Sequence, residues 1–368
     1  MSPYSARLEA AQRRLQESSA AAVVLFPSRT LEYLTGFAED PSERALFVFL
    51  TADREPVCFV PALAAEQLRE QTPLEEIRTW TDTAGPAEPL SALLDELQLD
   101  GHHLLVDETM WARFTQLLES LLPNATFGLA TNLLSALRIR KDVVELEALA
   151  AAADAADQTM DAIARLGSDA VGMTETALAA RIETELAAAG GESLSFEPIV
   201  GSGPNGAMPH HTHGDREIVA GEPVVLDFGT RIQGYPSDQT RTVVFDGEPS
   251  ERFKQVHNVV RKAQQAAIET VEPGVTAGEI DAAARRIIEQ AGYGETFIHR
   301  TGHGVGLAVH EAPDIVAGSD RLLEANMVFS VEPGVYLPGE FGVRIEDLVV
   351  VTENGCRRLN TTPLEWRV

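Results

Sequence analysis

Apolar and polar residues follow two different periods along the first 135 residues of the chain. Some segments repeat apolar residues every three to four positions, which is typical of amphipathic helices, and others form short apolar runs, which are typical of buried strands. The predicted helices are Pro3–Ser18, Pro61–Arg69, Glu88–Leu97 and Met110–Leu121, and the predicted strands are Ala21–Phe26, Arg44–Leu50, Pro56–Val60 and His103–Val106. This alternation predicts an α/β layered domain over residues 1–135.

A second domain, predicted over residues 136–368, begins with a long alanine-rich helical stretch and contains an internal repeat. Two helical segments of equal length run between glycines, Gly172–Gly190 and Gly274–Gly292. Each follows a longer predicted helix and precedes strands punctuated by glycine. Thr276 and Glu279 have the spacing of a capping box. Two similar halves predict a pseudo-symmetric domain with a cleft between them.

Charge and composition narrow the classes of function. The 368 residues carry a net charge of −27, which argues against nucleic acid and anionic membranes because both need a basic face. The two cysteines, Cys58 and Cys356, form neither a disulfide framework nor a zinc pattern. No apolar segment approaches the length of a transmembrane helix, and the N-terminus lacks the pattern of a signal peptide. We therefore expect a cytoplasmic protein.

Four carboxylates of the second domain lie in apolar runs that are typical of buried strands. They are Asp227, Asp238, Glu332 and Glu346. The segment between the first two contains two glycines and a proline, as expected of a hairpin. A single acid in a strand is usually ion-paired or faces water, but an unpaired ionised carboxylate in a core is strongly unfavourable. Because only Arg241 and Arg344 lie nearby in sequence, metal ions are the better explanation for all four together.

The segment Thr301–Glu311 reads Thr-Gly-His-Gly-Val-Gly-Leu-Ala-Val-His-Glu. Its glycines allow the backbone to approach another group closely, and it contains His303 and His310, with His299 just upstream. Histidine is the commonest metal ligand. Four carboxylates and one neutral imidazole, that of His303, carry a charge of −4, which two divalent cations cancel. Oxygen-rich ligation with one nitrogen is typical of Mn²⁺, with Co²⁺ and Zn²⁺ as alternatives.

The five candidate ligands occur in an order that resembles the signature of the pita-bread metallopeptidases. This order is Asp227, Asp238, His303, Glu332 and Glu346. The family includes methionine aminopeptidase, aminopeptidase P, prolidase and creatinase, and the second domain is most similar to the Xaa-Pro peptidase branch. The first domain resembles the creatinase N-terminal domain in size, order of elements and the piece Tyr33-Leu-Thr-Gly-Phe. The resemblance implies a mixed α/β (α+β) protein with a creatinase-like α/β domain before a pita-bread domain.

The resemblance also implies roles for the five ligands. Asp227 would chelate one divalent metal, and Asp238 and Glu346 would bridge both. His303 and Glu332 would bind the second metal. A hydroxide bridging the two metals would attack the scissile carbonyl, and Glu332 would take its proton.

Further histidines match substrate-contacting positions of the family. His210 would stabilise the tetrahedral intermediate, the role of a donor beside a developing oxyanion. His310 would bind substrate and pass a proton to the leaving nitrogen. His299 is a candidate for a further substrate contact. His211 and His213 follow His210 so closely that we interpret them as residues of the loop or rim.

Two other side chains are candidates for supporting the ligands. Arg344 lies two residues before Glu346, and hence on the same strand face, where it would hold a bridging carboxylate. Thr240 is a weaker candidate for the same role at Asp238.

Prolidase, which acts on dipeptides, and aminopeptidase P, which acts on longer peptides, share these site residues. Both imply peptide substrates with proline at the second position, and a homodimer. We expect a prolidase, because the first domain offers an arginine for the carboxylate that follows proline in a dipeptide. Arg44, at the end of the polar loop 38–43, is preferred to Arg29 for this anchor. The alternative interpretation of Arg44 is a solvated arginine beside Glu43.

Three further functions are weighed against this one. Methionine aminopeptidase needs no separate N-terminal domain of this size. Creatinase works without the metals and tends not to retain every ligand. Some pita-bread domains have lost metal and catalysis and only bind peptides or proteins, but those typically lack some of the five ligands, all of which are present here.

Overall fold

The computed structural model describes residues 3–368 and divides into two compact units, Met1–Arg138 and Ile139–Val368. Each unit mixes helices and strands, as expected from the sequence.

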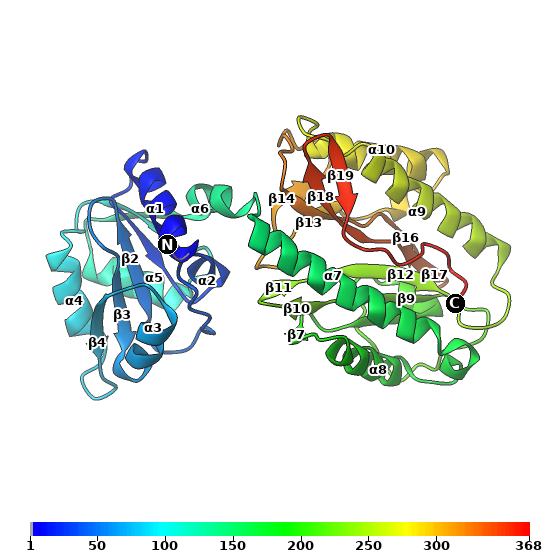
Figure 1. Ribbon diagram of the computed structural model, residues 1–368, viewed down its shortest axis with the longest axis horizontal. Coiled ribbons are helices and arrows are strands. Elements are labelled where there is room, and N and C mark those ends of the chain that lie inside the picture. The colour runs from blue at the N-terminus through cyan, green and yellow to red at the C-terminus, as the bar shows by residue number, and fades with distance from the viewer. Residues whose placement is uncertain (1–2) are drawn as a thin grey trace. The chain divides into compact units, whose positions relative to one another are not determined.

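The first unit contains one six-stranded sheet with helices around it (Figure 1). Its elements are α1 (Pro3–Gln16), β1 (Ala22–Leu25), α2 (Arg29–Thr35), β2 (Phe47–Thr51), β3 (Val57–Pro61), η1 (Ala62–Ala64), α3 (Ala65–Gln71), β4 (Glu76–Trp80), α4 (Ala87–Glu96), β5 (His103–Val106), α5 (Ala112–Leu121), β6 (Thr126–Leu129) and α6 (Thr131–Arg138). The strand order is β4-β3-β2-β1-β5-β6, and β1 pairs antiparallel with β2 and parallel with β5. All eight predicted elements are present within a few residues, whereas α2, β4, β6 and α6 were not predicted, since their apolar patterns are short.

Four helices of the second unit form two pairs that correspond to the predicted repeat. They are α7 (Val143–Ala164), α8 (Glu175–Ala188), α9 (Glu251–Glu269) and α10 (Ala277–Gln290). The predicted capping box at the start of α10 is confirmed, because Thr276 accepts from the Glu279 amide and the Glu279 side chain accepts from the Thr276 amide. Asp142 and Glu145 form a second capping box at the start of α7.

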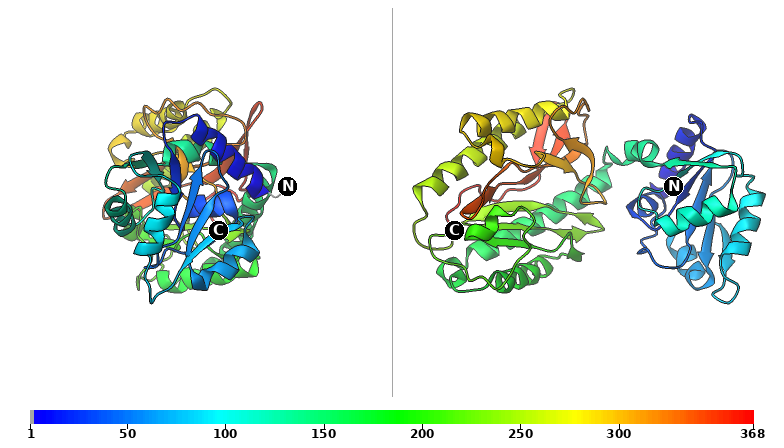
Figure 2. Two further views of the ribbon diagram at one scale, coloured as in Figure 1. Left: turned by 90° about the vertical axis from the view of Figure 1, so that its left-hand side faces the viewer. Right: turned by 180° about the vertical axis from the view of Figure 1, so that it is seen from behind.

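The strands of the second unit lie between the two helix pairs (Figure 2). They are β7 (Ser193–Leu194), β8 (Ile199–Ser202), β9 (Val224–Phe228), β10 (Thr230–Ile232), β11 (Tyr235–Pro236), β12 (Gln239–Val243), β13 (Gly302–Gly304), β14 (Glu311–Ile315), β15 (Val328–Val331), β16 (Gly334–Leu337), β17 (Phe341–Arg344), β18 (Asp347–Thr352) and β19 (Gly355–Arg358). Their orders are β11-β10-β7, β12-β9-β8, β14-β13-β15-β18-β19 and β16-β17. Three short 3₁₀ helices complete the unit: η2 (Gly167–Ala170), η3 (Gly203–Ala207) and η4 (Gly294–Thr296).

The expected hairpin between the two aspartates is present. Strands β9 and β12 pair antiparallel with Asp227 opposite Thr240. Their connection carries a second, tighter hairpin, β10–β11, whose turn residues Gln233 and Gly234 both have positive φ, 51° and 81°. That backbone matches the twist of the flanking strands. The chain therefore leaves β9 after Asp227 and returns to it at Asp238.

Candidate metal centre

Strand alternation determines which way Asp227 points. In β9, the side chains of Val224, Leu226 and Phe228 pack in the core formed with α7 and α8. Because successive side chains of a strand point to opposite faces, Asp227 faces away from those helices.

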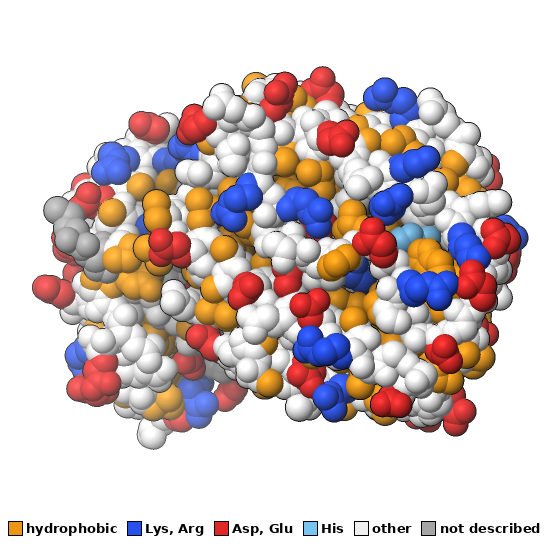
Figure 3. Space-filling model, turned by 45° about the vertical axis from the view of Figure 1, so that its right-hand side comes forward, with side chains coloured by type: hydrophobic (Ala, Val, Ile, Leu, Met, Phe, Trp, Pro, Cys, Tyr) orange, Lys and Arg blue, Asp and Glu red, His pale blue; other side chains and the backbone are white. Residues whose placement is uncertain are grey.

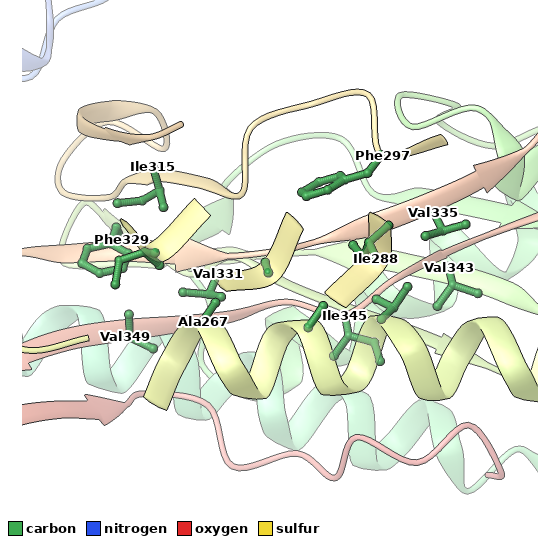
Figure 4. Close-up of a cluster of buried hydrophobic side chains, with 14 of the residues drawn as sticks. Ala267, Ile288, Phe297, Ile315, Phe329, Val331, Val335, Val343, Ile345 and Val349 are labelled. Atoms are coloured by element: carbon green, nitrogen blue, oxygen red, sulfur yellow. The ribbon is translucent and has the colours of Figure 1, made fainter. Parts of the chain in front are cut away.

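The same alternation determines which way Glu332 and Glu346 point in the second half of the repeat. Val331 and Ile345 belong to the core against α9 and α10, where Figure 4 shows them among other buried side chains of the strands. Their neighbours Glu332 and Glu346 therefore face away from these helices. The internal repeat turns acids from both halves inward, each backed by an apolar core.

All five candidate ligands meet in one place. The Nε2 atom of His303 lies 3.6 Å from Oδ2 of Asp238 and 3.3 Å from Oε1 of Glu332. One ligand atom each from Asp238, His303 and Glu346 lie within 4.8 Å of one another, and all three residues are buried. Asp227 is close enough that its charge raises the pKa of Asp238.

Burial and mutual repulsion set the protonation of this cluster. Burial, followed by the charge of neighbouring carboxylates, raises the pKa values of Asp238 and Glu346 well above their usual range. Burial raises the pKa of Glu332 to about 7 and lowers the pKa of His303 to about 3. The imidazole is therefore neutral at pH 7 with a nitrogen lone pair to offer. The negative charge of these buried carboxylates is only partly balanced by nearby positive side chains, and bound cations would supply the missing positive charge.

The hydrogen-bond inventory also fits cations in this cluster. Within residues 3–368, the buried atoms Oδ1 of Asp227 and Oε1 of Glu346 have no hydrogen-bond partner. Buried oxygens without partners are costly unless something coordinates them. Carboxylate oxygens and a neutral imidazole are the donor set that Mn²⁺, Co²⁺ and Zn²⁺ accept.

Arg344 connects several groups at the edge of this cluster. Its Nη2 atom donates to Oδ2 of Asp227 at 2.5 Å, its Nε atom to Oγ1 of Thr240 at 3.1 Å, and its Nη1 atom to the Tyr336 hydroxyl at 2.9 Å. Thr240 in turn donates to Oε2 of Glu346 at 2.6 Å. The guanidinium thus holds Asp227 directly and Glu346 through one threonine.

One prediction about a supporting residue is wrong in its partner, and another is incomplete. Thr240 was expected to support Asp238, but a β-bridge pairs it with Glu346, so its hydroxyl reaches that carboxylate instead. Arg344 was expected to hold a bridging carboxylate. It reaches Glu346 through Thr240, and it also bonds directly to Asp227, the predicted chelating ligand. Pairing between strands far apart in sequence decides both contacts.

His299 and Tyr336 extend this arrangement. The Nδ1 atom of His299 lies 2.7 Å from the carbonyl oxygen of Arg300, so it carries the proton and donates. The Nε2 atom, 2.9 Å from the Tyr336 hydroxyl, then accepts, and Tyr336 accepts from Arg344. Burial lowers the pKa of His299 to about 4, which agrees with a neutral ring. Both ring nitrogens are engaged, so only ring carbons remain for a substrate contact.

His310 and His210 lie close to the cluster. The ring centroid of His310 is 4.2 Å from that of His303. His210 is exposed. Burial is the main cause that lowers the pKa values of His299 and His310, and His210 lies near enough to both rings to contribute to that lowering. Figure 3 shows histidine atoms at the surface with lysine and arginine side chains around them.

The neighbours of His210 differ in environment. His211 was interpreted as a residue of the loop or rim. It lies in the loop, but its side chain is only 19 % exposed and its Nε2 lies 2.8 Å from Oε2 of buried Glu175. The loop interpretation of His211 therefore agrees with the structure, whereas a position on the rim does not. His213 contacts the Thr176 hydroxyl at 3.1 Å and Glu197 at 3.5 Å.

Arg44, the predicted carboxylate anchor, belongs to the first unit. Its Nε and Nη2 atoms donate to the two oxygens of Asp82 at 3.2 and 3.0 Å, and Nη1 donates to Glu43 at 2.8 Å. This side chain and that of Asp82 are exposed, 36 % and 61 %. A role for Arg44 in substrate binding stays a prediction.

Sequence reasoning missed two side chains that contact the candidate site residues. Ser330 donates to Oε1 of Glu332 at 3.1 Å and accepts from the backbone amide of His303. Tyr336 is buried between His299 and Arg344. Strand alternation places Ser330 on the face of Glu332, which was a usable signal. Tyr336 lies in an apolar run without any such signal.

Comparison with known proteins identifies the family. Residues 147–353 match Metallopeptidase family M24, and residues 7–140 match the Creatinase/Prolidase N-terminal domain. The chain belongs to Metallopeptidase family M24, as the sequence resemblance predicted, and the pita-bread architecture expected with it is confirmed.

Relatives and solved structures match over nearly the whole chain. An Xaa-Pro dipeptidase of Lactobacillus delbrueckii subsp. lactis is 37% identical over 98% of both chains. A probable dipeptidase PepE of Mycobacterium bovis is 40% identical over 98% of this chain and 96% of that protein. The crystal structure of a prolidase from Thermococcus sibiricus has a TM-score of 0.94 at 37% identity and covers 99% of this chain and 98% of that chain. Among residues 3–368, no helix is long and apolar enough to cross a membrane.

Proposed function

We propose that this chain is a dinuclear metallopeptidase that hydrolyses Xaa-Pro dipeptides. The observation that carries this proposal is the cluster of buried carboxylates and one neutral imidazole, with two carboxylate oxygens that lack hydrogen-bond partners. The residues that would hold two divalent cations are Asp227, Asp238, His303, Glu332 and Glu346. The printed activities of the relatives, Xaa-Pro dipeptidase and prolidase, support the substrate class.

When bound, the metal pair supplies a nucleophile at neutral pH by lowering the pKa of water. Glu332 receives the proton of the attacking water, and the hydrogen bond from Ser330 supports this role by orienting Oε1. His210 donates to the oxygen that becomes negative as the scissile carbonyl is attacked. His310 carries a proton to the leaving nitrogen of proline, a role that its exposed position beside His303 supports.

Arg344 keeps the ligands in order without touching the reacting atoms. Its fixed charge offsets that of Asp227, and its bond to Thr240 orients the hydroxyl that holds Glu346. Partners of metal ligands commonly set both metal affinity and activity. Mn²⁺ as the preferred ion, a homodimer and a cytoplasmic location stay predictions from the sequence.

The test is a hydrolysis panel with the purified chain. Metal is removed with a chelator, Mn²⁺, Co²⁺ or Zn²⁺ is restored, and Xaa-Pro dipeptides are compared with tri- and tetrapeptides that carry proline second. We expect metal-dependent release of free proline, with the highest kcat/KM for dipeptides. A protein that binds two metals per chain but prefers longer peptides would be an aminopeptidase P, the second candidate. A protein that binds neither metal nor hydrolyses any of these peptides would be a peptide-binding module.

A further inference from the structure

Glu175 is a fully buried carboxylate at the first residue of α8, outside the metal centre. Thr174 already caps this helix by accepting from the Ala177 amide, so Glu175 is not needed as a cap. Its oxygens instead accept hydrogen bonds from four residues of a single downstream segment. The donors are the amide and hydroxyl of Ser202 at 2.7 Å each, Nδ2 of Asn205 at 3.0 and 3.1 Å, Nε2 of His211 at 2.8 Å and the amide of Gly214 at 3.0 Å.

These donors span residues 202–214, which we call the His210 loop. Ser202 ends β8, Asn205 lies in η3, and Gly214 follows the last histidine of the loop. One carboxylate therefore ties the start, the middle and the end of the loop to α8. An uncharged side chain of similar size offers fewer acceptors for this set of donors.

His210 itself is held only through its neighbours. Its side chain is exposed, and within residues 3–368 the structure gives it no hydrogen bond. On one side, the carbonyl oxygen of Pro209 accepts from Nη1 of Arg344 at 3.3 Å. On the other side, His211 is bound to Glu175 at 2.8 Å. The location of the His210 ring therefore depends on two anchors, one at the metal centre and one at Glu175.

We propose that Glu175 is a positioning residue that sets the location of His210 relative to the metal ligands. The inference rests on the proposed function, in which His210 stabilises the oxyanion. Removing the carboxylate releases the loop on one side, and a displacement of about 1 Å from a catalytic position can cost about 10²-fold in rate. We expect Glu175→Gln to lower kcat by about 10²-fold with little change in KM. Metal content should stay at the wild-type value.

The control is Glu183→Gln, which makes the same chemical change at an exposed position of the same helix. It should retain wild-type kcat and loop exchange. A double-mutant cycle separates positioning from general destabilisation. If Glu175 acts through His210, adding Glu175→Gln to His210→Ala should cause no further loss of kcat, because the group that it positions is gone. An additive loss, or loss of metal from Glu175→Gln, would overturn the proposal.

A second readout is independent of peptidase activity. Hydrogen exchange should accelerate at the amides of Ser202 and Gly214 in Glu175→Gln, while peptides that contain the metal ligands keep their protection. A wild-type chain without Xaa-Pro hydrolysis would end the proposed function, and unchanged exchange would end the positioning role. If Glu175→Gln does not fold, His211→Ala takes its place in the same cycle, since it removes the contact between the His211 ring and Glu175. Additivity with His210→Ala would again overturn the proposal.

Discussion

Arg344 and Asp227 form a buried guanidinium–carboxylate contact of 2.5 Å between residues separated by 117 positions. It joins the two halves of the repeat, since Asp227 lies on β9 and Arg344 ends β17. The contact leaves Oδ1 of Asp227 without a hydrogen-bond partner in the described chain and therefore free for a cation. Arg344 thus orients a ligand and offsets part of the negative charge of the cluster.

Arg344→Lys should weaken metal binding although it retains the positive charge. Lysine cannot donate at once to Asp227, Thr240 and Tyr336, as the guanidinium does. We expect metal affinity to fall by about 10- to 100-fold, the usual effect of losing a partner of a metal ligand. Calorimetric titration of the metal-free protein with Mn²⁺ measures this change. Arg357→Lys, at an exposed position, is the control, and equal affinities for the two variants would contradict the role of Arg344.

Asp238→Asn should remove metal binding without destabilising the metal-free protein. Burial and the neighbouring carboxylates raise the pKa of Asp238, so its negative charge is unfavourable in the metal-free protein and asparagine removes that charge. We expect the metal-free variant to melt at or above the temperature of the metal-free wild type. The increase in melting temperature on adding Mn²⁺ should disappear, together with nearly all hydrolysis, because an amide supplies no bridging charge. Full turnover of this variant at saturating Mn²⁺ would refute the ligand assignment.

The sequence was sufficient to select the five candidate ligands and Arg344 beside them, but not Ser330 or Tyr336. Acids within apolar strands stand out because burial of an unpaired charge is unfavourable, and strand alternation then predicts the face on which each acid lies. Glu175 gave no such signal, since an acid at the start of a helix has an ordinary explanation in the helix dipole. Its partners lie on a loop whose path no local pattern specifies.

Each half of the internal repeat contains a hydrogen bond from a glutamine to an aspartate, and the two bonds correspond to each other. In the first half, Gln239 on β12 donates to Asp157 on α7 at 2.6 Å. In the second half, Gln264 on α9 donates to Asp347 on β18 at 2.6 Å. Each strand residue directly follows a predicted bridging ligand, but the amide and the carboxylate have exchanged elements between the halves. A comparison of residue types along the two halves therefore misses this helix-to-strand hydrogen bond, which the structure shows in both halves.

His257 should make the stability of the protein depend on pH. Burial lowers the pKa of this ring to about 4, below its ordinary value of 6.5. The folded state thus keeps the ring neutral. The contribution of this ring to the free energy of unfolding is fully present above pH 6.5 and is lost as the pH falls through 4. The loss amounts to about 2 kcal/mol between pH 7 and pH 5.

Urea unfolding of wild type and His257→Gln at these two pH values measures this contribution. Glutamine keeps an amide donor and does not titrate, so the unfolding midpoint of the variant should fall less between pH 7 and pH 5. The same fall in both proteins would mean that other groups dominate the acid sensitivity.

Substrate length provides the last prediction, and it concerns Arg44 and Asp82. A dipeptide ends in a carboxylate directly after proline, which an arginine can bind through two parallel hydrogen bonds. Arg44 already makes this kind of contact with Asp82, at 3.2 and 3.0 Å. Since exposed ion pairs contribute little, the carboxylate of a substrate can replace that of Asp82.

Two variants should then act in opposite directions. Arg44→Ala should raise KM for Xaa-Pro dipeptides and leave tripeptide cleavage unchanged or improved. Asp82→Ala removes the competing carboxylate and should lower KM for dipeptides. Arg300→Ala is the comparison, because Arg300 lies beside His299 in the second unit and pairs with Asp314 through Nη1 alone. A higher KM for dipeptides in Arg300→Ala, with none in Arg44→Ala, would transfer the anchor to Arg300. A cation that binds the terminal carboxylate favours dipeptides, because that carboxylate directly follows proline in a dipeptide and not in a longer peptide.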